Sequence, residues 1–310
     1  MIQLNQSIFS IGSCFSDMIA GRLSHNKWSV TANPFGTLYD PISIERNISN
    51  SLSDQPISDA LLGQREDVVF HYYYHSDLSA LSLPILSNII ELAHEQTKSS
   101  ILNADWIVLT YGSTIVYKHK ELGEMVANCH KVPQNQFDKE MLTQRDVRSS
   151  IQNTIECIRK VNPNAQFILT VSPVRHLKHG MEQNMLSKSI LRLACEEIVN
   201  RNKGTIYFPS YEIMMDELRD YKYYKQDKVH PAAEAEDYIW DTFKTALVDE
   251  NAIKFIEQWD EITRALQHRP MHVASKAHQR FLKETLMKLE ELSSEIDVTK
   301  ERAQLQSQLI

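Results

Sequence analysis

The sequence predicts an α/β protein in which a parallel sheet is covered by helices on both faces. Short apolar segments alternate with amphipathic helical ones through residues 1–250, which is the pattern of parallel strands joined by helical crossovers. Polar residues follow several of these strands, at the sheet edge where open parallel sheets bind ligands. From residue 251 onward only helical periodicity remains. We therefore expect one catalytic-sized domain over residues 1–250 and a helical extension over residues 251–310.

The expected elements follow one another in a regular order. The expected strands are residues 8–11, 28–30, 105–110, 166–171 and 205–209. The expected helices are residues 17–23, 42–52, 88–98, 136–160, 184–200 and 233–246. Residues 67–78, rich in aromatic and branched side chains, predict an edge hairpin. Apolar stripes over residues 255–266 and 281–292 predict a C-terminal helical hairpin, and the polar residues 299–310 are expected to fray.

Composition and charge exclude several classes of partner. The net charge is -7 at pH 7, and no run of lysine and arginine is long enough to form a basic stripe, so we expect no nucleic-acid partner. The first residues lack the basic and apolar regions of a signal peptide, and no apolar run reaches the length of a membrane span. A cytoplasmic location is therefore expected.

The cysteines do not form a recognisable framework. Four cysteines are too few and too scattered for a set of disulfides or a zinc knuckle. Cys157 and Cys195 fall in helical patterns and are expected in the core, whereas Cys14 and Cys129 lie in polar, turn-rich stretches.

Two histidines and an aspartate alternate within the expected edge hairpin. His71, His75 and Asp77 lie at period-two spacing and are expected to share a face. The solvated face of an edge strand explains this pattern better than a metal site, so we predict no metal. His75 and Asp77 could still line a polar pocket.

Residues 8–17 combine a strand, a turn and the start of a helix. Gly12 can take the backbone shape that a sharp turn needs, and such an elbow places a small nucleophile above the end of a sheet. Ser13 and Cys14 are the candidates. The first N–H groups of the following helix favour a thiolate or an oxyanion, so the pKa of Cys14 is expected to be low. A buried cysteine in an ordinary turn is the alternative.

Further polar loops could complete this site. Gly36 closes a tight turn and is either an oxyanion donor through its backbone N–H or a plain structural glycine. Asn128 and His130 lie in a polar turn where they could contact a substrate, and His130 competes for the role of general base. Asp227 and His230 are three residues apart before a helix. This spacing lets the carboxylate orient the imidazole, or it could serve only to cap the helix.

Six motifs, in this order, resemble those of the GSCFA-domain proteins. They are residues 12–16 (Gly-Ser-Cys-Phe-Ser), 33–36 (Asn-Pro-Phe-Gly), 128–131 (Asn-Cys-His-Lys), 172–176 (Ser-Pro-Val-Arg-His), 208–212 (Phe-Pro-Ser-Tyr-Glu) and 227–231 (Asp-Lys-Val-His-Pro). The family's last letter, Ala, is Ser16 here. The GSCFA family is similar to the SGNH/GDSL hydrolases. The resemblance therefore implies a flavodoxin-like three-layer α/β sandwich and acyl-ester chemistry.

The sequence departs from the wider superfamily at two positions. Counted from Gly12, Cys14 takes the place of the usual nucleophilic serine. A cysteine at this place also resembles the arrangement in some capsule-polysaccharide acetyltransferase families of similar fold. The Gly-x-Asn block that normally supplies an oxyanion donor begins at Gly112 but has Thr114 in place of the asparagine. The Thr114 hydroxyl or the Asn128 side chain could replace it.

The resemblance leads to one enzymatic hypothesis. Cys14 attacks an acyl carbonyl, His230 acts as base and then acid, Asp227 orients it, and the N–H groups of Cys14 and Gly36 hold the oxyanion. Ser13 is the alternative nucleophile.

By family analogy the substrate is a carbohydrate O-acyl ester, most simply O-acetyl, contacted by Arg175, His176 and His75. No cofactor is expected beyond acyl-CoA as a donor, should the acyl group pass to a hydroxyl instead of water. A catalytically degenerate binding module, whose helical extension meets a protein partner, is the alternative. The extension could also form a homodimer contact.

Overall fold

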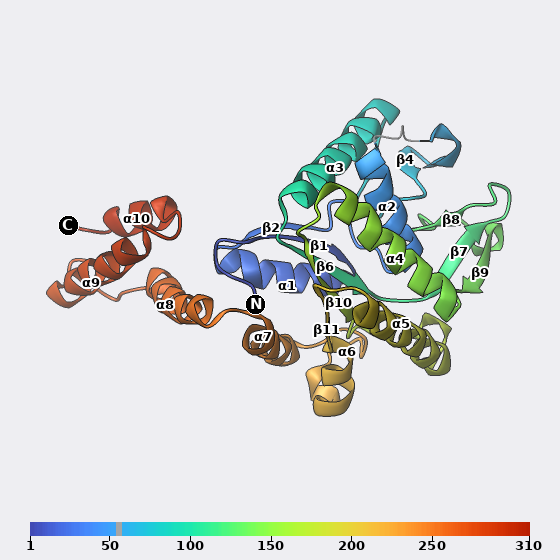
Figure 1. The fold of residues 1–310 in the computed structure, drawn as a ribbon. Coiled ribbons are helices and arrows are strands. Elements are labelled where there is room, and N and C mark those ends of the chain that lie inside the picture. The colour runs from blue at the N-terminus through green and yellow to red at the C-terminus, as the bar shows by residue number, and fades with distance from the viewer. Residues whose placement is uncertain (54–57) are drawn as a thin grey trace.

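A five-stranded parallel sheet forms the centre of the protein (Figure 1). The computed structural model describes residues 1–53 and 58–310. The strands are β1 (Ser7–Gly12), β2 (Ser29–Ala32), β6 (Trp106–Tyr111), β10 (Gln166–Val171) and β11 (Thr205–Phe208). Their spatial order, β2-β1-β6-β10-β11, is the order of the flavodoxin-like fold. The predicted fold class is thus confirmed.

Helices cover both faces of the sheet. They are α1 (Cys14–His25), α2 (Pro41–Ser53), α3 (Leu83–Asn103), α4 (Gln144–Val161), α5 (Met181–Arg201), α6 (Ser210–Glu212) and α7 (Ala233–Leu247). Successive residues of a strand point to opposite faces. Ile107 and Leu109 of β6 therefore pack with α2 to α5, whereas Trp106 and Val108 pack with α1 and α7.

Two small antiparallel sheets flank the parallel one. The first contains β3 (Leu62–Arg65), β4 (Val68–His71) and β5 (Ser79–Ala80), and the second contains β7 (Ile115–His119), β8 (Met125–Val126) and β9 (Phe137–Met141). Single-turn helical segments occupy Asp59–Leu61, Gln134–Gln136, Leu177–His179, Ile213–Glu217 and Tyr221–Tyr223.

The long helix predicted over residues 136–160 is wrong in its first part. Residues Phe137–Met141 form β9, which pairs with β7, and α4 begins only at Gln144. The helix starts there because Thr143 and Asp146 form a capping box, each side chain bonding the other's backbone N–H.

The predicted shared face of the edge hairpin is also wrong. β4 ends at His71, whose side chain is fully buried and contacts the Ser58 carbonyl through Nε2 at 3.2 Å. His75 lies beyond the strand, in a turn, with its Nδ1 3.0 Å from Oδ2 of Asp77. Period-two alternation therefore does not extend from His71 to Asp77.

The C-terminal helices pack at the amino edge of the sheet. They are α8 (Glu250–Gln267), α9 (Lys276–Leu292) and α10 (Thr299–Gln306). The indole N–H of Trp259 donates to the carbonyl of His25 at 2.8 Å, and Lys27 pairs with Glu301 at 2.8 Å. His25 and Lys27 precede β2, so this edge is opposite the elbow after β1 (Figure 1). The extension therefore does not cover the elbow.

Residues 299–306 form α10 instead of fraying, because the Leu305 side chain is fully buried in the same apolar cluster as Trp259 and Phe15. The expected homodimer contact and the division at residue 250 stay predictions. Within the described ranges, no helix has both the length and the apolar character needed to cross a membrane.

Candidate active site

The elbow between β1 and α1 needs a glycine at position 12. Gly12 has φ 145°, and a Cβ there would lie 2.1 Å from the carbonyl oxygen of Thr110 on β6. Its N–H donates to Oδ1 of Asn33 at 2.8 Å, and the N–H of Ser13 donates to the Thr110 carbonyl at 3.2 Å. The chain therefore turns sharply against β6, at the point where the strand order of the sheet reverses.

Ser13 and Cys14 have different surroundings. Ser13 is the N-cap of α1, fully buried, and its Oγ accepts the N–H of Phe15 at 3.3 Å. Cys14 is the first residue of the helix and is partly exposed. Its own N–H makes no hydrogen bond to another described residue, as expected for the first turn of a helix, and acts on the thiol of the same residue. The thiol and a free N–H donor thus lie side by side.

The expected low pKa of Cys14 is wrong. Burial raises the pKa of the thiol, and the carboxylate of Asp17, one turn along α1, raises it further. The backbone N–H of Cys14 and the charges of Lys225 and Lys188 oppose this rise without cancelling it. At neutral pH the thiol therefore keeps its proton and needs a base to remove it.

His230 and Asp227 form a close pair. Nδ1 of His230 lies 2.7 Å from Oδ2 of Asp227, while Oδ1 accepts the backbone N–H groups of Val229 and His230 at 2.8 and 3.0 Å. These bonds hold the pKa of Asp227 well below its usual range, so the carboxylate stays charged. With Nδ1 facing the carboxylate, Nε2 is left to exchange a proton.

Cys14 and the His230 loop lie at the same edge of the sheet. Cys14 follows β1, and the loop is tied to the segment after β10 because the N–H of Arg175 donates to the Val229 carbonyl at 3.2 Å. Lys225 connects the two further. Its N–H donates to the His230 carbonyl at 2.8 Å, and its charge acts on Cys14. Among the described residues no hydrogen bond joins the thiol to the imidazole.

The N–H of Gly36 is not free for an oxyanion in this conformation, which favours the alternative of a structural glycine. It donates to the carbonyl of Asn33 at 2.8 Å and closes the turn. A Cβ at Gly36 would lie 2.5 Å from Cβ of His75, and its φ of 72° also favours glycine. Glycine at this position therefore brings His75 against the turn after β2.

The predicted role of Thr114 as an oxyanion donor is also wrong for this conformation. Its side chain is fully buried, so its hydroxyl cannot reach a substrate. Its N–H donates to Oγ of Ser187 at 2.8 Å. Gly112 instead allows close packing, because a Cβ there would lie 3.0 Å from Nε2 of His176 and 3.2 Å from the Tyr39 ring.

His130 is held as a structural side chain, which argues against it as general base. Its ring stacks on Phe70 with centroids 4.2 Å apart, and its Nε2 lies 3.2 Å from the His71 carbonyl. Burial lowers the pKa of His130 to about 4. Asn128 lies in the same turn, where its Oδ1 accepts the N–H of His130 at 2.8 Å.

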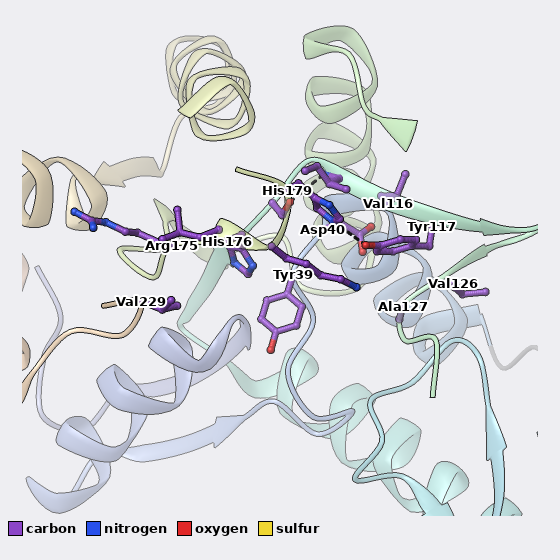
Figure 2. A pocket seen from close by; sticks show the side chains of 14 residues that line it. Tyr39, Asp40, Val116, Tyr117, Val126, Ala127, Arg175, His176, His179 and Val229 are labelled. Carbon is purple, nitrogen blue, oxygen red and sulfur yellow. Dashed lines mark hydrogen bonds between the residues drawn. The ribbon is translucent and has the colours of Figure 1, made fainter. Parts of the chain in front are cut away.

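A pocket of about 370 Å³ opens beside the His230 loop (Figure 2). Tyr39, Tyr117, His176 and Val229 are among its lining residues. Nε2 of His176 is buried without a hydrogen-bond partner, and burial lowers the pKa of His176 to about 3, so the ring is neutral. Arg175 extends away from Tyr117 in Figure 2, with its guanidinium 4.0 Å from the Tyr224 ring centre. Arg175 therefore shapes the rim more than the interior.

Sequence reasoning missed one polar face of α5. Asn184 accepts the N–H of His176 at 2.8 Å, Ser187 accepts the N–H of Thr114, and Lys188 donates to the Ser172 carbonyl at 2.7 Å. The three residues support the loops after β6 and β10. They have i, i+3 and i+4 spacing and lie on the same helix face as the buried Leu191. Polar residues on an otherwise apolar face were therefore the sequence signal that could have identified them.

Comparison with known proteins gives a family and two distant structural likenesses. A carbohydrate esterase family 3 structure from Talaromyces cellulolyticus has 8% identity and TM-score 0.37, covering 84% of this chain and 99% of that one. An acetyl xylan esterase from the rumen bacterium Butyrivibrio proteoclasticus has 10% identity and TM-score 0.36, covering 80% and 65%. The comparison with curated proteins gave no match.

The family assignment is direct. The GSCFA family model matches residues 7–243, and that of the GSCFA domain protein, C-terminal domain, matches residues 259–310. The chain belongs to the GSCFA family.

Proposed function

We propose that this protein cleaves acyl esters through a covalent acyl-enzyme, with Cys14 as nucleophile, His230 as general base and acid, and Asp227 as the group that orients His230. The observation that carries the proposal is the placement of a partly exposed thiol on the first residue of α1, at the same sheet edge as the Asp227–His230 pair. This edge is where the flavodoxin-like fold places its ligands.

The raised pKa of Cys14 favours general-base catalysis over a preformed ion pair. Nε2 of His230 takes the thiol proton as sulfur attacks the acyl carbonyl, and then gives it to the departing alkoxide. The product is a thioester on Cys14. Water or another hydroxyl attacks the thioester with His230 again as base, which releases the acyl group and returns the thiol. A base and nucleophile that are apart in the free protein often approach only when substrate is bound.

The oxyanion is stabilised first by the free N–H of Cys14 and the positive end of α1. A second donor would come from Gly36 after its turn bond to Asn33 opens, or from the amide of Asn128.

The substrate class we propose is carbohydrate O-acetyl esters. Family membership supports it, and so does the pocket beside the His230 loop, where the rings of Tyr39 and Tyr117 lie next to polar side chains such as His176, a combination typical of a binding site for a small organic ligand. His176 and Arg175 line this pocket, and His75 packs against the turn at Gly36. The acyl group passes to water or to a hydroxyl acceptor. In the second case acyl-CoA is the proposed donor, and no other cofactor is required.

A non-catalytic binding module is the second candidate function. It is favoured by the engaged N–H of Gly36 and the buried hydroxyl of Thr114, since neither can hold an oxyanion in this conformation. In that case the pocket would hold a carbohydrate without cleaving it.

A panel of short-chain aryl esters and acyl-CoA donors, with and without a sugar acceptor, tests these alternatives. We expect the wild type to release the aryl alcohol and Cys14→Ala to lose this turnover. Ser13→Ala serves as the matched variant and should retain it, at a stability cost of about 1 kcal/mol for the lost cap. Full turnover by Cys14→Ala would contradict the role of Cys14 as nucleophile. If the wild type is inactive on every ester, the binding module is the candidate function that remains.

A further inference from the structure

Lys188 is a fully buried lysine next to the proposed site. Its side chain has no solvent exposure, and the one acceptor that the described residues offer to its Nζ is the Ser172 carbonyl, at 2.7 Å. The ring of Tyr211 lies 5.4 Å from Nζ. An ammonium carries three donors, and burying a charge without a carboxylate partner is costly. A methionine or leucine would fill this core position at lower cost.

The contacts of Lys188 connect it to the elbow. Ser172 follows β10, and its N–H donates to the Tyr111 carbonyl on β6 at 2.9 Å. The preceding residue of β6, Thr110, accepts the N–H of Ser13 at 3.2 Å. A continuous chain of hydrogen-bonded backbone therefore joins the ammonium on α5 to the residue before Cys14.

Few charged groups face Cys14 and Lys188. Asp17 on α1 and Lys225 in the His230 loop act on Cys14 together with Lys188. Cys14 acts in turn on Lys188, as does Glu212 of α6, and Lys188 acts on His176. Burial lowers the pKa of Lys188 to about 7, so its charge changes within the working range of an enzyme at neutral pH.

We propose that Lys188 is a positioning residue whose buried ammonium stabilises the thiolate that forms on Cys14. Among the described residues, no hydrogen bond joins Lys188 to the sulfur of Cys14. Its influence on the thiolate is therefore electrostatic and acts across the carboxyl edge of the sheet. Because Lys188 is fully buried, solvent and salt screen this influence less than that of an exposed lysine. The inference rests on the proposed role of Cys14 as nucleophile.

The rate of Cys14 alkylation by iodoacetamide as a function of pH tests the proposal. Lys188→Gln keeps an N–H donor for the Ser172 carbonyl and removes the charge. We expect alkylation about threefold or more slower at neutral pH, with the inflection moved to higher pH, since one pKa unit is tenfold in thiolate. The exposed Lys222→Gln is the control and should leave the profile unchanged. The difference should persist in high salt, whereas any effect of the exposed Lys225→Gln should shrink.

A folded Lys188→Gln protein with the wild-type profile overturns the proposal. If that variant does not fold, Lys188→Met decides, because it keeps the length of the buried side chain and removes the charge. A folded Lys188→Met protein with the wild-type profile contradicts the proposal equally. Alkylation of Cys14 is measured independently of ester cleavage. A Cys14→Ala protein that still cleaves esters would therefore remove the proposed function while leaving the electrostatic link intact.

Discussion

At the scale of single residues, chemistry depends on which group is left free. The hydroxyl of Ser13 is used to cap α1, whereas the thiol of Cys14 is partly exposed and makes no hydrogen bond to another described residue. Asp227 uses both oxygens to organise its loop and the His230 ring. The contact between Asp227 and His230 is the one that their spacing predicts. Its catalytic role stays a prediction.

Replacing Asp227 with asparagine tests that role. The asparagine amide would present a donor or a weaker acceptor to Nδ1 of His230. The ring would then lose its orientation, and the tautomer with the proton on Nδ1 would no longer be favoured. We expect kcat/KM for an aryl acetate to fall on the order of a hundredfold or more. Asp220→Asn, in the same loop region and bonded to the N–H of Lys222, is the control. Equal activity of the two variants would argue against an orienting carboxylate.

At the scale of elements, the strand, elbow and helix of residues 7–25 fold as predicted because each part has its own signal. β1 is apolar and buried, Gly12 meets the backbone of β6, and Ser13 caps α1. β9 lacks such a signal. Its Phe137 is followed by three charged residues, so the segment reads equally well as the polar start of a helix. The capping box at Thr143 marks the true start of α4.

Two glycine substitutions distinguish the steric constraint at the elbow from the ordinary helix propensity of α1. Gly12→Ala places a Cβ against the Thr110 carbonyl at a φ that alanine avoids, so we expect a loss of about 3 kcal/mol or more in the free energy of unfolding. Gly21→Ala lies in α1 with no atom within 4 Å of the added Cβ, and should stabilise the protein by about 0.5 to 1 kcal/mol. Urea unfolding measures both. A tolerated Gly12→Ala would contradict the tight approach of β1 and β6.

At the scale of the molecule, the parallel sheet and the family could be predicted from the sequence, and the completed site could not. Buried strands are runs of branched and aromatic residues, and motifs in order identify the family. Whether the N–H of Gly36 is free, or whether the hydroxyl of Thr114 is buried, depends on packing between distant segments. Lys188 lies in line with the buried Leu191, which was the available signal, but only the packing of α5 shows that its charge is fully buried.

Burial of histidine rings makes the stability of the whole protein depend on pH. It lowers the pKa values of His71, His94 and His130 to about 4 and that of His176 to about 3, below the ordinary value of 6.5. The unfolded chain therefore binds more protons than the folded one between these values, so stability is lost as the pH falls from about 6.5 toward 4. We expect unfolding by urea to become easier by roughly 1 to 2 kcal/mol per histidine between pH 7 and pH 5.

His94→Gln should flatten this dependence, because Gln does not titrate. Exposed His272→Gln should not. A wild type equally stable at both pH values would show that these rings are charged in the fold.

The most direct test of the account is to trap the acyl-enzyme. The protein is mixed with a fast-reacting aryl acetate, quenched in acid within one turnover, digested and mapped by mass spectrometry. We predict one acetyl group per chain, on the tryptic peptide of residues 1–22 and on the sulfur of Cys14, with less of it in His230→Ala. An acetyl group on Ser13, or ester cleavage with no acetylated peptide at any time, would contradict the account.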